Sequence, residues 1–382
     1  MRIAVNTLSV TDDNEGIRTM LIGLVPALVR LDRTNRYRLI VSAANERLLA
    51  DVSGQVDMTV IDQKRRRPLL RILHDQTTVP WGLRHDTDLL LTLSSVGSLL
   101  APVPQVVVLV AHLALPSVRK DAGGIRPSLF HRVYYGPVMR LSHRRAAAVV
   151  AISRFLADRL VADTGVPASK VHAIPCGIDL ARIPPLTAAA TQGSPYVLFV
   201  STLYPYKNAE AVIRGLAHAL PRLDLPLSAI IVGRDFDGTQ IAALRNVADN
   251  LGIGSQVTLT GKVSDEERDR LYAGATAVVF PSLAEGFGFA PLEAMARGIP
   301  VVVANRTSLP EVVGDAALIV DPDRPEELGD AIVRLVGEPG LRADLVAGGR
   351  ARAAELSWDR AALSFIELFS QLKPAGAAGA ER

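Results

Sequence analysis

The sequence predicts an α/β protein in which two Rossmann-like domains, each with a mostly parallel sheet, follow one another along the chain. Short apolar runs of strand length alternate with segments of helical period in both halves. The alternation stops once, in a stretch rich in proline, alanine and glycine at residues 185–195, and then starts again. A length of 382 residues and a hydrophobic content of 49% suffice for two cores.

Seven apolar runs are expected to form the sheet of the first domain, residues 1–184. They are residues 2–6, 38–42, 58–62, 88–92, 106–111, 148–152 and 171–174. Helical periodicity predicts helices at residues 16–31, after Pro127 and at residues 154–164. No G-x-G-x-x-G motif follows the first run, so the dinucleotide-binding fingerprint is absent.

Residues 89–117 carry no charge, a pattern that a membrane-spanning helix would share. Gly97, Pro102 and Pro104 interrupt this stretch, and the pieces between them have the length of strands. We therefore expect two buried parallel strands joined by a loop.

The second domain is expected at residues 196–356, after the linker at residues 185–195. Its strands are predicted at residues 196–201, 229–233, 257–260, 277–280, 301–304 and 318–320, and its helices at residues 209–220, 239–251, 265–274, 292–297, 325–336 and 340–355. Residues 357–372 are expected to form a helix that packs back towards the first domain. Residues 373–382, rich in alanine and glycine, are expected to be a disordered tail. Two such domains predict a ligand site in the cleft between them, at the C-terminal ends of the strands.

The net charge of +3 is unevenly divided. Residues 1–184 contain 24 of the 42 Lys+Arg and 15 of the 39 Asp+Glu, a net charge of +9. The remaining residues contain 18 Lys+Arg and 24 Asp+Glu, a net charge of −6. The basic first half indicates an anionic partner, and we expect a peripheral contact with an anionic membrane and no nucleic acid. Solvated helix faces account equally well for the scattered basic residues, of which only residues 64–67 form a run.

The single cysteine, Cys176, excludes a disulfide framework and a cysteine-based zinc site, and it fits a reducing compartment. No apolar segment typical of a signal peptide follows the first residues, so we expect a cytoplasmic protein, peripheral on the inner membrane face. The histidines show no metal-binding spacing, and the G-x-S-x-G hydrolase motif is absent. We expect neither a metal nor another cofactor.

A strand–loop–helix segment around Glu285 carries the pattern of an anion site. The apolar residues 277–280 lead into a loop with Gly286 and Gly288, and Pro291 suits the first turn of a helix that Gly298 ends. Such a loop offers backbone N–H groups and the positive end of a helix dipole to phosphate. Two carboxylates, Glu285 and Glu293, flank it and are better suited to accept hydrogen bonds from sugar hydroxyls. An ordinary unit with solvated acids remains the alternative.

Two further residues follow predicted strands. Lys207, in the segment Tyr204-Pro-Tyr-Lys-Asn208, comes after the first strand of the second domain and can reach a diphosphate in the same cleft. His112 follows an uncharged strand of the first domain, on the side where the cleft is expected. A structural role with satisfied hydrogen bonds is the alternative for His112.

These segments resemble the retaining GT-B glycosyltransferases of the "group 1" or family 4 type. The signature is Glu285-x7-Glu293 within E-G-F-G-F-A-P-L-E-A-M-A-R-G-I-P-V-V. Other matching segments follow the order of the family: Gly16, His112, residues 149–153, residues 174–179, residues 202–208, residues 257–261 and residues 308–311. The resemblance covers nearly the whole chain and is weakest at residues 35–87.

The resemblance implies metal-independent transfer of a hexose, with mannose expected, from a nucleotide-diphosphate sugar to a saccharide or lipid-linked acceptor in polysaccharide biosynthesis. The anomeric configuration would be retained. It also implies a role for each matching residue. For the diphosphate, Lys207 balances its charge and Gly16 approaches it, while the amides of Gly286, Phe287, Gly288 and Phe289 hold the phosphates and the sugar. Glu285 binds the donor sugar, His112 touches the transferred sugar, Glu293 binds the ribose, Val263 lies near the base, and Thr202 belongs to the donor-binding segment.

The sequence departs from the family at three places. Many relatives have Arg at the position of Thr202 or Tyr206, so a second phosphate-binding cation is missing, and Arg234 or Arg306 would have to replace it. Leu113 follows His112 where Asp is common, and Cys176 stands where Asn is usual. Two other function classes stay open: a nucleotide-sugar 2-epimerase of the same architecture and a non-catalytic protein that binds sugar nucleotides.

Overall fold

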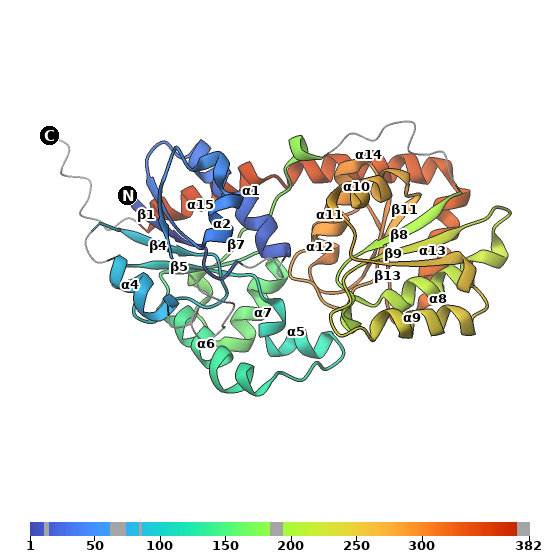
Figure 1. The fold of residues 1–382 in the computed structure, drawn as a ribbon, viewed down its shortest axis with the longest axis horizontal. Coiled ribbons are helices and arrows are strands. Elements are labelled where there is room, and N and C mark those ends of the chain that lie inside the picture. Colours follow the sequence, from blue (N-terminus) through green and yellow to red (C-terminus); the bar gives the residue numbers. More distant parts are fainter. Residues whose placement is uncertain (11–14, 62–73, 84–85, 184–193, 373–382) are drawn as a thin grey trace. The chain divides into compact units, whose positions relative to one another are not determined.

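The computed structural model describes residues 1–10, 15–61, 74–83, 86–183 and 194–372, apart from the side chain of Glu15. The basic run 64–67, most of the expected linker 185–195 and the expected tail 373–382 lie outside the described residues. The chain divides into two compact units (Figure 1). The first unit contains Met1–Ser117, Arg126–Gly177 and the chain from Leu356 onward, and the second contains Val118–Ile125 and Ile178–Glu355.

The first unit contains a seven-stranded sheet in the order β3-β2-β1-β4-β5-β6-β7, and all neighbouring strands are parallel. The strands are β1 (Arg2–Asn6), β2 (Arg36–Val41), β3 (Asp57–Val60), β4 (Leu89–Thr92), β5 (Gln105–Leu109), β6 (Ala148–Ala151) and β7 (Val171–Ala173). Every residue of β4, β5 and β6 is buried, as expected for central strands covered on both faces.

The uncharged residues 89–117 form the predicted pair of strands. β4 and β5 are neighbours in the sheet, with Leu91 opposite Val106. Among the helices of the described part of the chain, none is both long and apolar enough to cross a membrane. The lack of charge in this segment therefore reflects burial within the sheet.

The α-helices before residue 178 are α1 (Glu15–Leu31), α2 (Ala43–Leu48), α4 (Val79–Gly82), α5 (Pro116–Asp121), α6 (Gly136–Arg145) and α7 (Arg154–Thr164). α7 shows why these residues form a helix there. The hydroxyl of Ser153 accepts a hydrogen bond from the N–H of Leu156, and Gly165 ends the helix in the left-handed conformation.

The C-terminal helix α15 (Trp358–Gln371) belongs to the first unit, where it packs on α1. The Trp358 ring fills the space that a side chain at Gly23 would need, since a Cβ built there would lie 2.2 Å from the ring. Arg30 of α1 forms an ion pair with Asp359 of α15. Gly177 makes a similar close approach, because its Cβ would lie 2.2 Å from the carbonyl carbon of Ser357.

The second unit contains a six-stranded parallel sheet in the order β10-β9-β8-β11-β12-β13. The strands are β8 (Tyr196–Val200), β9 (Ser228–Val232), β10 (Val257–Gly261), β11 (Ala277–Phe280), β12 (Val301–Ala304) and β13 (Leu318–Val320). The strand order reverses between β8 and β11. In open α/β sheets, ligands bind at this reversal, beyond the C-terminal ends of the strands.

The α-helices of the second unit are α8 (Ala209–Ala219), α9 (Gln240–Asn250), α10 (Asp265–Gly274), α11 (Phe289–Arg297), α12 (Leu309–Val313), α13 (Pro325–Gly337) and α14 (Pro339–Glu355). Two details differ from the sequence-based prediction. α11 begins at Phe289 and not at residue 292, because the chain turns at Gly288, where φ is +122°. α12 was not predicted, since its five residues are too few to show a helical period.

The architecture confirms the predicted fold class: two units, each an α/β structure built on a parallel sheet. The site residues predicted for the second domain follow β8, β10 and β11. Because these strands are parallel, those residues lie at one edge of one sheet.

Candidate active site

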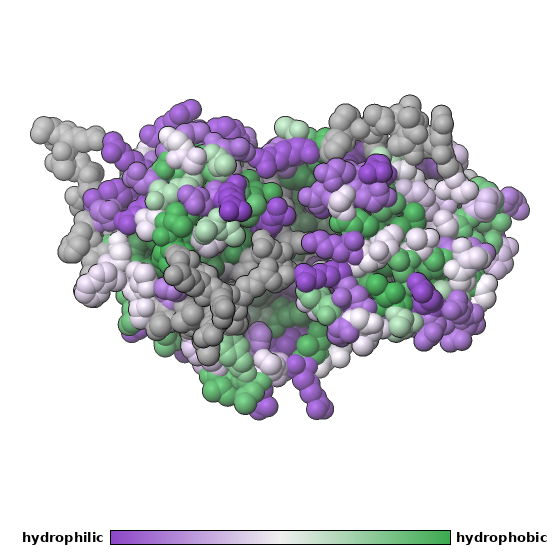
Figure 2. All heavy atoms as spheres, in the orientation of Figure 1, coloured by the Kyte–Doolittle hydropathy of each residue, from purple (hydrophilic) through white to green (hydrophobic). Residues whose placement is uncertain are grey.

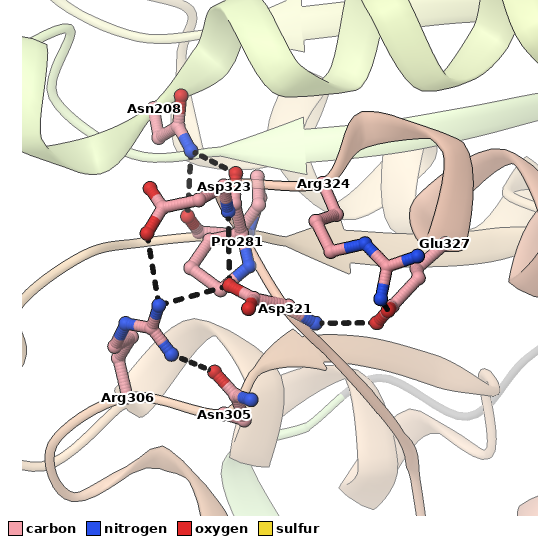
Figure 3. A network of polar contacts seen from close by, with 9 residues as sticks. Asn208, Pro281, Asn305, Arg306, Asp321, Asp323, Arg324 and Glu327 are labelled. Carbon is pink, nitrogen blue, oxygen red and sulfur yellow. Dashed lines mark hydrogen bonds and ion pairs between the residues drawn. The ribbon is translucent and has the colours of Figure 1, made fainter.

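The loop after β8 carries Lys207 to the reversal of the strand order. Lys207 ends a 3-10 turn (Pro205–Lys207), and Asn208 follows it in the left-handed conformation, with φ of +58°. The side-chain amide of Asn208 donates to the carbonyl oxygens of Pro281, at 3.3 Å, and Pro322, at 3.2 Å (Figure 3). The β8 loop is thereby tied to the segments that follow β11 and β13.

Lys207 and Glu285 form a buried ion pair. The Lys207 Nζ lies 2.6 Å from Glu285 Oε1, and the two side chains are 12% and 9% exposed. Nζ also lies 5.2 Å from the centre of the Tyr206 ring and 5.7 Å from that of Phe280. An ion pair in such a setting is held by its hydrogen bond and mutual charge, because neither ion keeps its full hydration.

The Tyr206 ring is part of this buried setting. Burial, and to a lesser extent the charge of Glu285 and the neighbouring Tyr204, raise the pKa of Tyr206 above its ordinary value, so the side chain is a neutral phenol. Its carbonyl oxygen accepts a hydrogen bond from the N–H of Leu283, at 2.8 Å. The β8 loop and the β11 loop are therefore joined next to Lys207.

The loop from Glu285 to Gly288 is fixed by residues that follow β12. The N–H of Glu285 donates to Thr307 Oγ1 at 2.9 Å. Ser308 Oγ lies within hydrogen-bond distance of the carbonyl oxygens of Glu285, at 3.1 Å, and Phe287, at 2.9 Å. Gly288 has no room for a side chain, since a Cβ would lie 2.9 Å from Leu309 Cδ2. This loop leads directly into α11, whose positive dipole end suits an anion.

Backbone strain marks the same place. Within the described part of the chain, the non-glycine residues with positive φ are Asn208 and Thr307, at +58° and +53°. This conformation is unusual for a β-branched residue such as threonine and costs on the order of 1–2 kcal/mol. Asn208 directly follows Lys207, and the hydroxyl of Thr307 accepts a hydrogen bond from the N–H of Glu285. Strain of this kind tends to be retained where it serves a functional site.

Glu293 lies on α11 and is about one-quarter exposed. Its carboxylate is 3.8 Å from the buried guanidinium of Arg297, one turn further along the helix. Arg297 in turn bonds Asp269 Oδ1 at 2.6 Å and lies 4.5 Å from the ring of Tyr272. Burial, and then the Glu293 charge, raise the pKa of Tyr272 well above its ordinary value, so it stays neutral. Arg297 therefore supports Glu293 from the interior.

The two arginines considered as a second phosphate cation differ in their partners. The guanidinium of Arg306 donates to Asp321 and Asp323, each at 2.9 Å, and to Asn305 (Figure 3). Arg234, after β9, lies 4.5 Å from the centre of the Phe236 ring. Phe236 stacks on Tyr204, which stacks on Tyr206, at ring distances of 5.3 and 5.7 Å.

The structure brings together part of the predicted site. Lys207, Glu285 and the loop from Gly286 to Phe289 form one cluster, as the distances above show. Thr202 and Val263 are half-buried and follow β8 and β10 at the same edge of the sheet. Gly16 and His112 belong to the first unit: Gly16 is exposed in the first turn of α1, and His112 begins a 3-10 turn after β5.

Sequence reasoning assigned no role to Thr307 or Arg297. The signal for Thr307 is weak, because a threonine in a turn is common and only the geometry reveals its bond to Glu285. Arg297 could have been suspected from its position four residues after Glu293, a spacing that places two side chains on one helix face. In the part of the chain that the structure describes, no cluster of three or more His, Cys, Asp or Glu side chains could hold a metal ion.

Comparison with known proteins gives two family matches. Residues 188–352 match the family described as "Glycosyl transferases group 1", and residues 16–182 match the one described as "Glycosyltransferase Family 4". Together the two matches cover most of the chain, one on each side of residue 185.

Curated relatives match over part of their length. The chain is 34% identical over 179 residues to O-antigen chain mannosyltransferase B of Escherichia coli, covering 46% of each chain. It is 32% identical over 228 residues to D-inositol 3-phosphate glycosyltransferase of Acidothermus cellulolyticus, covering 53% of this chain and 51% of the relative. The chain thus spans about half the length of these relatives.

Solved structures share the fold. A crystal structure of Anabaena HepE in complex with UDP and glucose has a TM-score of 0.74 at 20% identity and covers 97% of this chain and 100% of that one. Sucrose-phosphate synthase of Thermosynechococcus elongatus has a TM-score of 0.72 at 19% identity, covering 97% and 99%. At these identities the likeness establishes the fold and nothing beyond it.

Proposed function

Because the chain belongs to the group 1, family 4 glycosyltransferases of GT-B fold, we propose that it transfers a hexose from a nucleotide-diphosphate sugar to a saccharide or lipid-linked acceptor. The proposal includes retention of the anomeric configuration and independence of a metal ion. Mannose is the proposed hexose, since two of the curated relatives from Escherichia coli are named mannosyltransferases.

The observation that carries the proposal is the ion pair between Lys207 and Glu285 at the strand reversal. A diphosphate arriving there competes with the Glu285 carboxylate for the lysine ammonium. Once Lys207 turns to the diphosphate, the carboxylate of Glu285 loses its partner and can accept hydrogen bonds from donor-sugar hydroxyls. One pair thus supplies both contacts that the donor requires.

In the proposed reaction, the bond between the anomeric carbon and the diphosphate oxygen breaks while the acceptor hydroxyl oxygen bonds to the same carbon from the same face. The departing diphosphate oxygen takes the hydroxyl proton, so no protein nucleophile is needed. Negative charge grows on the diphosphate as this bond breaks. Lys207 and the amides from Gly286 to Phe289 would stabilise that charge because they are already oriented before reaction.

Arg234 is the proposed second cation. The guanidinium of Arg306 already donates to the carboxylates of Asp321 and Asp323. If it moved to a diphosphate, both carboxylates would lose this partner. Arg234 lies at the end of β9, next to β8, and its carbonyl oxygen accepts the N–H of Leu203 in the segment that leads to Lys207. Its guanidinium would supply the second positive charge for the diphosphate.

The remaining assignments rest on the family resemblance. Glu293 is proposed to bind the ribose, with Arg297 holding its carboxylate in position. Val263 is proposed to lie near the base, and Thr202 is assigned to the donor-binding segment. From the first unit, Gly16 is assigned to the diphosphate and His112 to the transferred sugar.

Thermal-shift measurements with GDP, UDP and dTDP test the donor first, since a ligand that binds only the folded state raises the melting temperature. We expect GDP to give the largest shift, and no shift with any of the three would overturn the proposal. Incubation with GDP-mannose, an acceptor and EDTA then tests the reaction. We expect an α-linked product unaffected by EDTA. Release of free GDP with no glycosylated acceptor would instead favour the epimerase class or simple hydrolysis.

A further inference from the structure

The helical segment just before α6 exposes apolar side chains on the first unit. Leu129 is 74% exposed and Val133 is 69% exposed, and Phe130 between them is also exposed. Figure 2 shows hydrophobic side chains gathered at the end of this unit that carries α6. Because Leu129 and Val133 are four residues apart on helical backbone, their side chains point to one side of it. We call the surface formed by Leu129, Phe130 and Val133 the α6 apolar patch.

The patch is a built feature and not a frayed end of the helix. Ser128 Oγ accepts the N–H of His131 at 3.3 Å and contacts its ring at 3.0 Å. The ring of Phe130 stacks on Tyr134 with centroids 5.3 Å apart. Further along, Ser142 and His143 are fully buried, and the His143 Nε2–H donates to the carbonyl oxygen of Ser95 at 2.8 Å. The far end of α6 is thus fixed to the core while the patch stays exposed.

The sequence around the patch is basic, although the carboxylate of Asp75 acts on Tyr134, whose ring stacks on Phe130. From residue 122 to residue 157 the sequence contains no Asp or Glu but six arginines. Arg126 and Arg132, which flank the patch, are exposed and have no ion pair with a carboxylate in the described part of the chain. Arg140, Arg144 and Arg145 donate to backbone carbonyl oxygens, contacts that leave their charge uncompensated.

We propose that the α6 apolar patch and its arginines dock the first unit onto the surface of an anionic lipid bilayer. Exposed leucine, phenylalanine and valine side chains, with exposed arginines in the same segment, are the composition of an interfacial membrane contact. A second copy of the chain fits the surface poorly, since a two-fold contact would set the same arginines against each other. Anionic lipids both accept the apolar side chains and neutralise the arginines.

Vesicle flotation of the full chain tests this proposal, with phosphatidylcholine vesicles that contain or lack phosphatidylglycerol. We expect binding only with phosphatidylglycerol, weakening as salt is raised. Leu129→Ser/Val133→Ser should lower the partition coefficient by at least about tenfold, because it removes two inserted side chains. Arg126→Gln/Arg132→Gln should lower it to a similar degree and also reduce its salt dependence. Leu363→Ser is the matched control: Leu363 is 54% exposed on α15 of the same unit and should have no effect.

The proposal would be overturned if the wild-type chain did not float with the vesicles at low salt, or if the Leu129→Ser/Val133→Ser variant floated equally well. It would also be overturned if the wild-type chain bound no vesicles and formed a dimer that this variant converts to a monomer. The last result would assign the patch to a second copy. Far-UV circular dichroism establishes that each variant is folded. The melting-temperature shift with nucleoside diphosphates reports ligand binding by the second unit, so it should be unchanged in all variants. This measurement separates a failure of the membrane proposal from a failure of the proposed function.

Discussion

Lys207 Nζ and Glu285 Oε1 lie 2.6 Å apart, although the family resemblance assigns them to different parts of the donor. Without a ligand, the Lys207 ammonium and the Glu285 carboxylate therefore neutralise each other. In the proposed function, donor binding would replace this pair with two new interactions at once, one to the diphosphate and one to the sugar. A bare phosphate or a bare sugar would supply only one of them, so the pair favours a ligand that carries both.

Replacing Lys207 by Met should lower donor turnover by at least about a hundredfold, because the departing diphosphate would lose its proposed cation. The variant should also lose about 3 kcal/mol or more of stability, since Glu285 would remain buried without its counter-charge. Turnover assays and urea unfolding measure the two effects. The double variant Lys207→Met/Glu285→Gln removes both charges and should recover part of the lost stability. Near-normal turnover of folded Lys207→Met would refute the assigned role.

Replacing Glu285 by Gln should slow sugar transfer by at least about tenfold, because a charged acceptor of hydroxyl hydrogen bonds is lost. Binding of the bare nucleoside diphosphate should be unchanged or tighter, since Lys207 would no longer be neutralised by a carboxylate. Transfer rates and calorimetric titration with the nucleoside diphosphate distinguish these outcomes. Equal losses in both measurements would mean that Glu285 has a structural role only.

The two candidate second cations should respond differently to substitution by methionine. Arg234→Met should weaken nucleoside-diphosphate binding by about tenfold, the loss expected for one hydrogen bond between charged groups. Arg306→Met should mainly lower stability, because Asp321 and Asp323 would lose their shared partner. Titration with the nucleoside diphosphate and urea unfolding of both variants provide the comparison. The reverse pattern would identify Arg306 as the second cation.

Replacing Gly288 by Ala should destabilise the second unit by about 1–3 kcal/mol, because φ is +122° there and the new Cβ would lie 2.9 Å from Leu309 Cδ2. Donor binding should weaken as well, since the loop that enters α11 would have to move. Gly337→Ala is the control: Gly337 ends α13, and a Cβ there meets no atom within 4 Å. Denaturant unfolding of the two variants should therefore give clearly different midpoints.

The buried His143 should make the protein less stable in mild acid. Burial lowers the pKa of His143 from 6.5 to about 4, so the folded state keeps the ring neutral while the unfolded chain takes up a proton as the pH falls below 6.5. Stability should therefore fall between pH 6.5 and pH 4, by up to about 3 kcal/mol from this group. In His143→Gln, an amide can replace the donor to Ser95, and this part of the pH dependence should vanish from unfolding curves. An unchanged pH dependence would mean that other groups cause it.

The strands were predictable because most of them are short apolar runs bounded by turn residues, with Arg or Asp only in β1, β2 and β3. All thirteen predicted runs overlap a strand. The central strands are buried on both faces of a parallel sheet, which makes them nearly uniform in hydropathy. Short helices carried no comparable signal. α12 has five residues, and its position depends on the bond between Ser308 and the carbonyl oxygens of the Glu285 loop, a contact distant in sequence.

The candidate site was predictable as a set of residue types but not as a set of partners. Lys207 and Glu285 each follow a strand, and parallel strands bring both to one edge of the sheet, so their proximity followed from the topology. Their mutual ion pair did not, because it depends on how two loops of irregular conformation meet. The same holds for Arg306: its two aspartates lie fifteen and seventeen residues further along the chain, after β13.

The close approach of Trp358 to Gly23 has a consequence for the order in which the chain folds. The second unit, apart from residues 118–125, is one continuous piece that is complete once Glu355 has been synthesised. All strands of the first unit precede those of the second unit in the chain, yet the face of α1 at Gly23 stays uncovered until α15 emerges. The unit whose strands come earlier in the chain is therefore completed later, and until α15 has been synthesised its apolar surface at Gly23 lacks the helix that covers it.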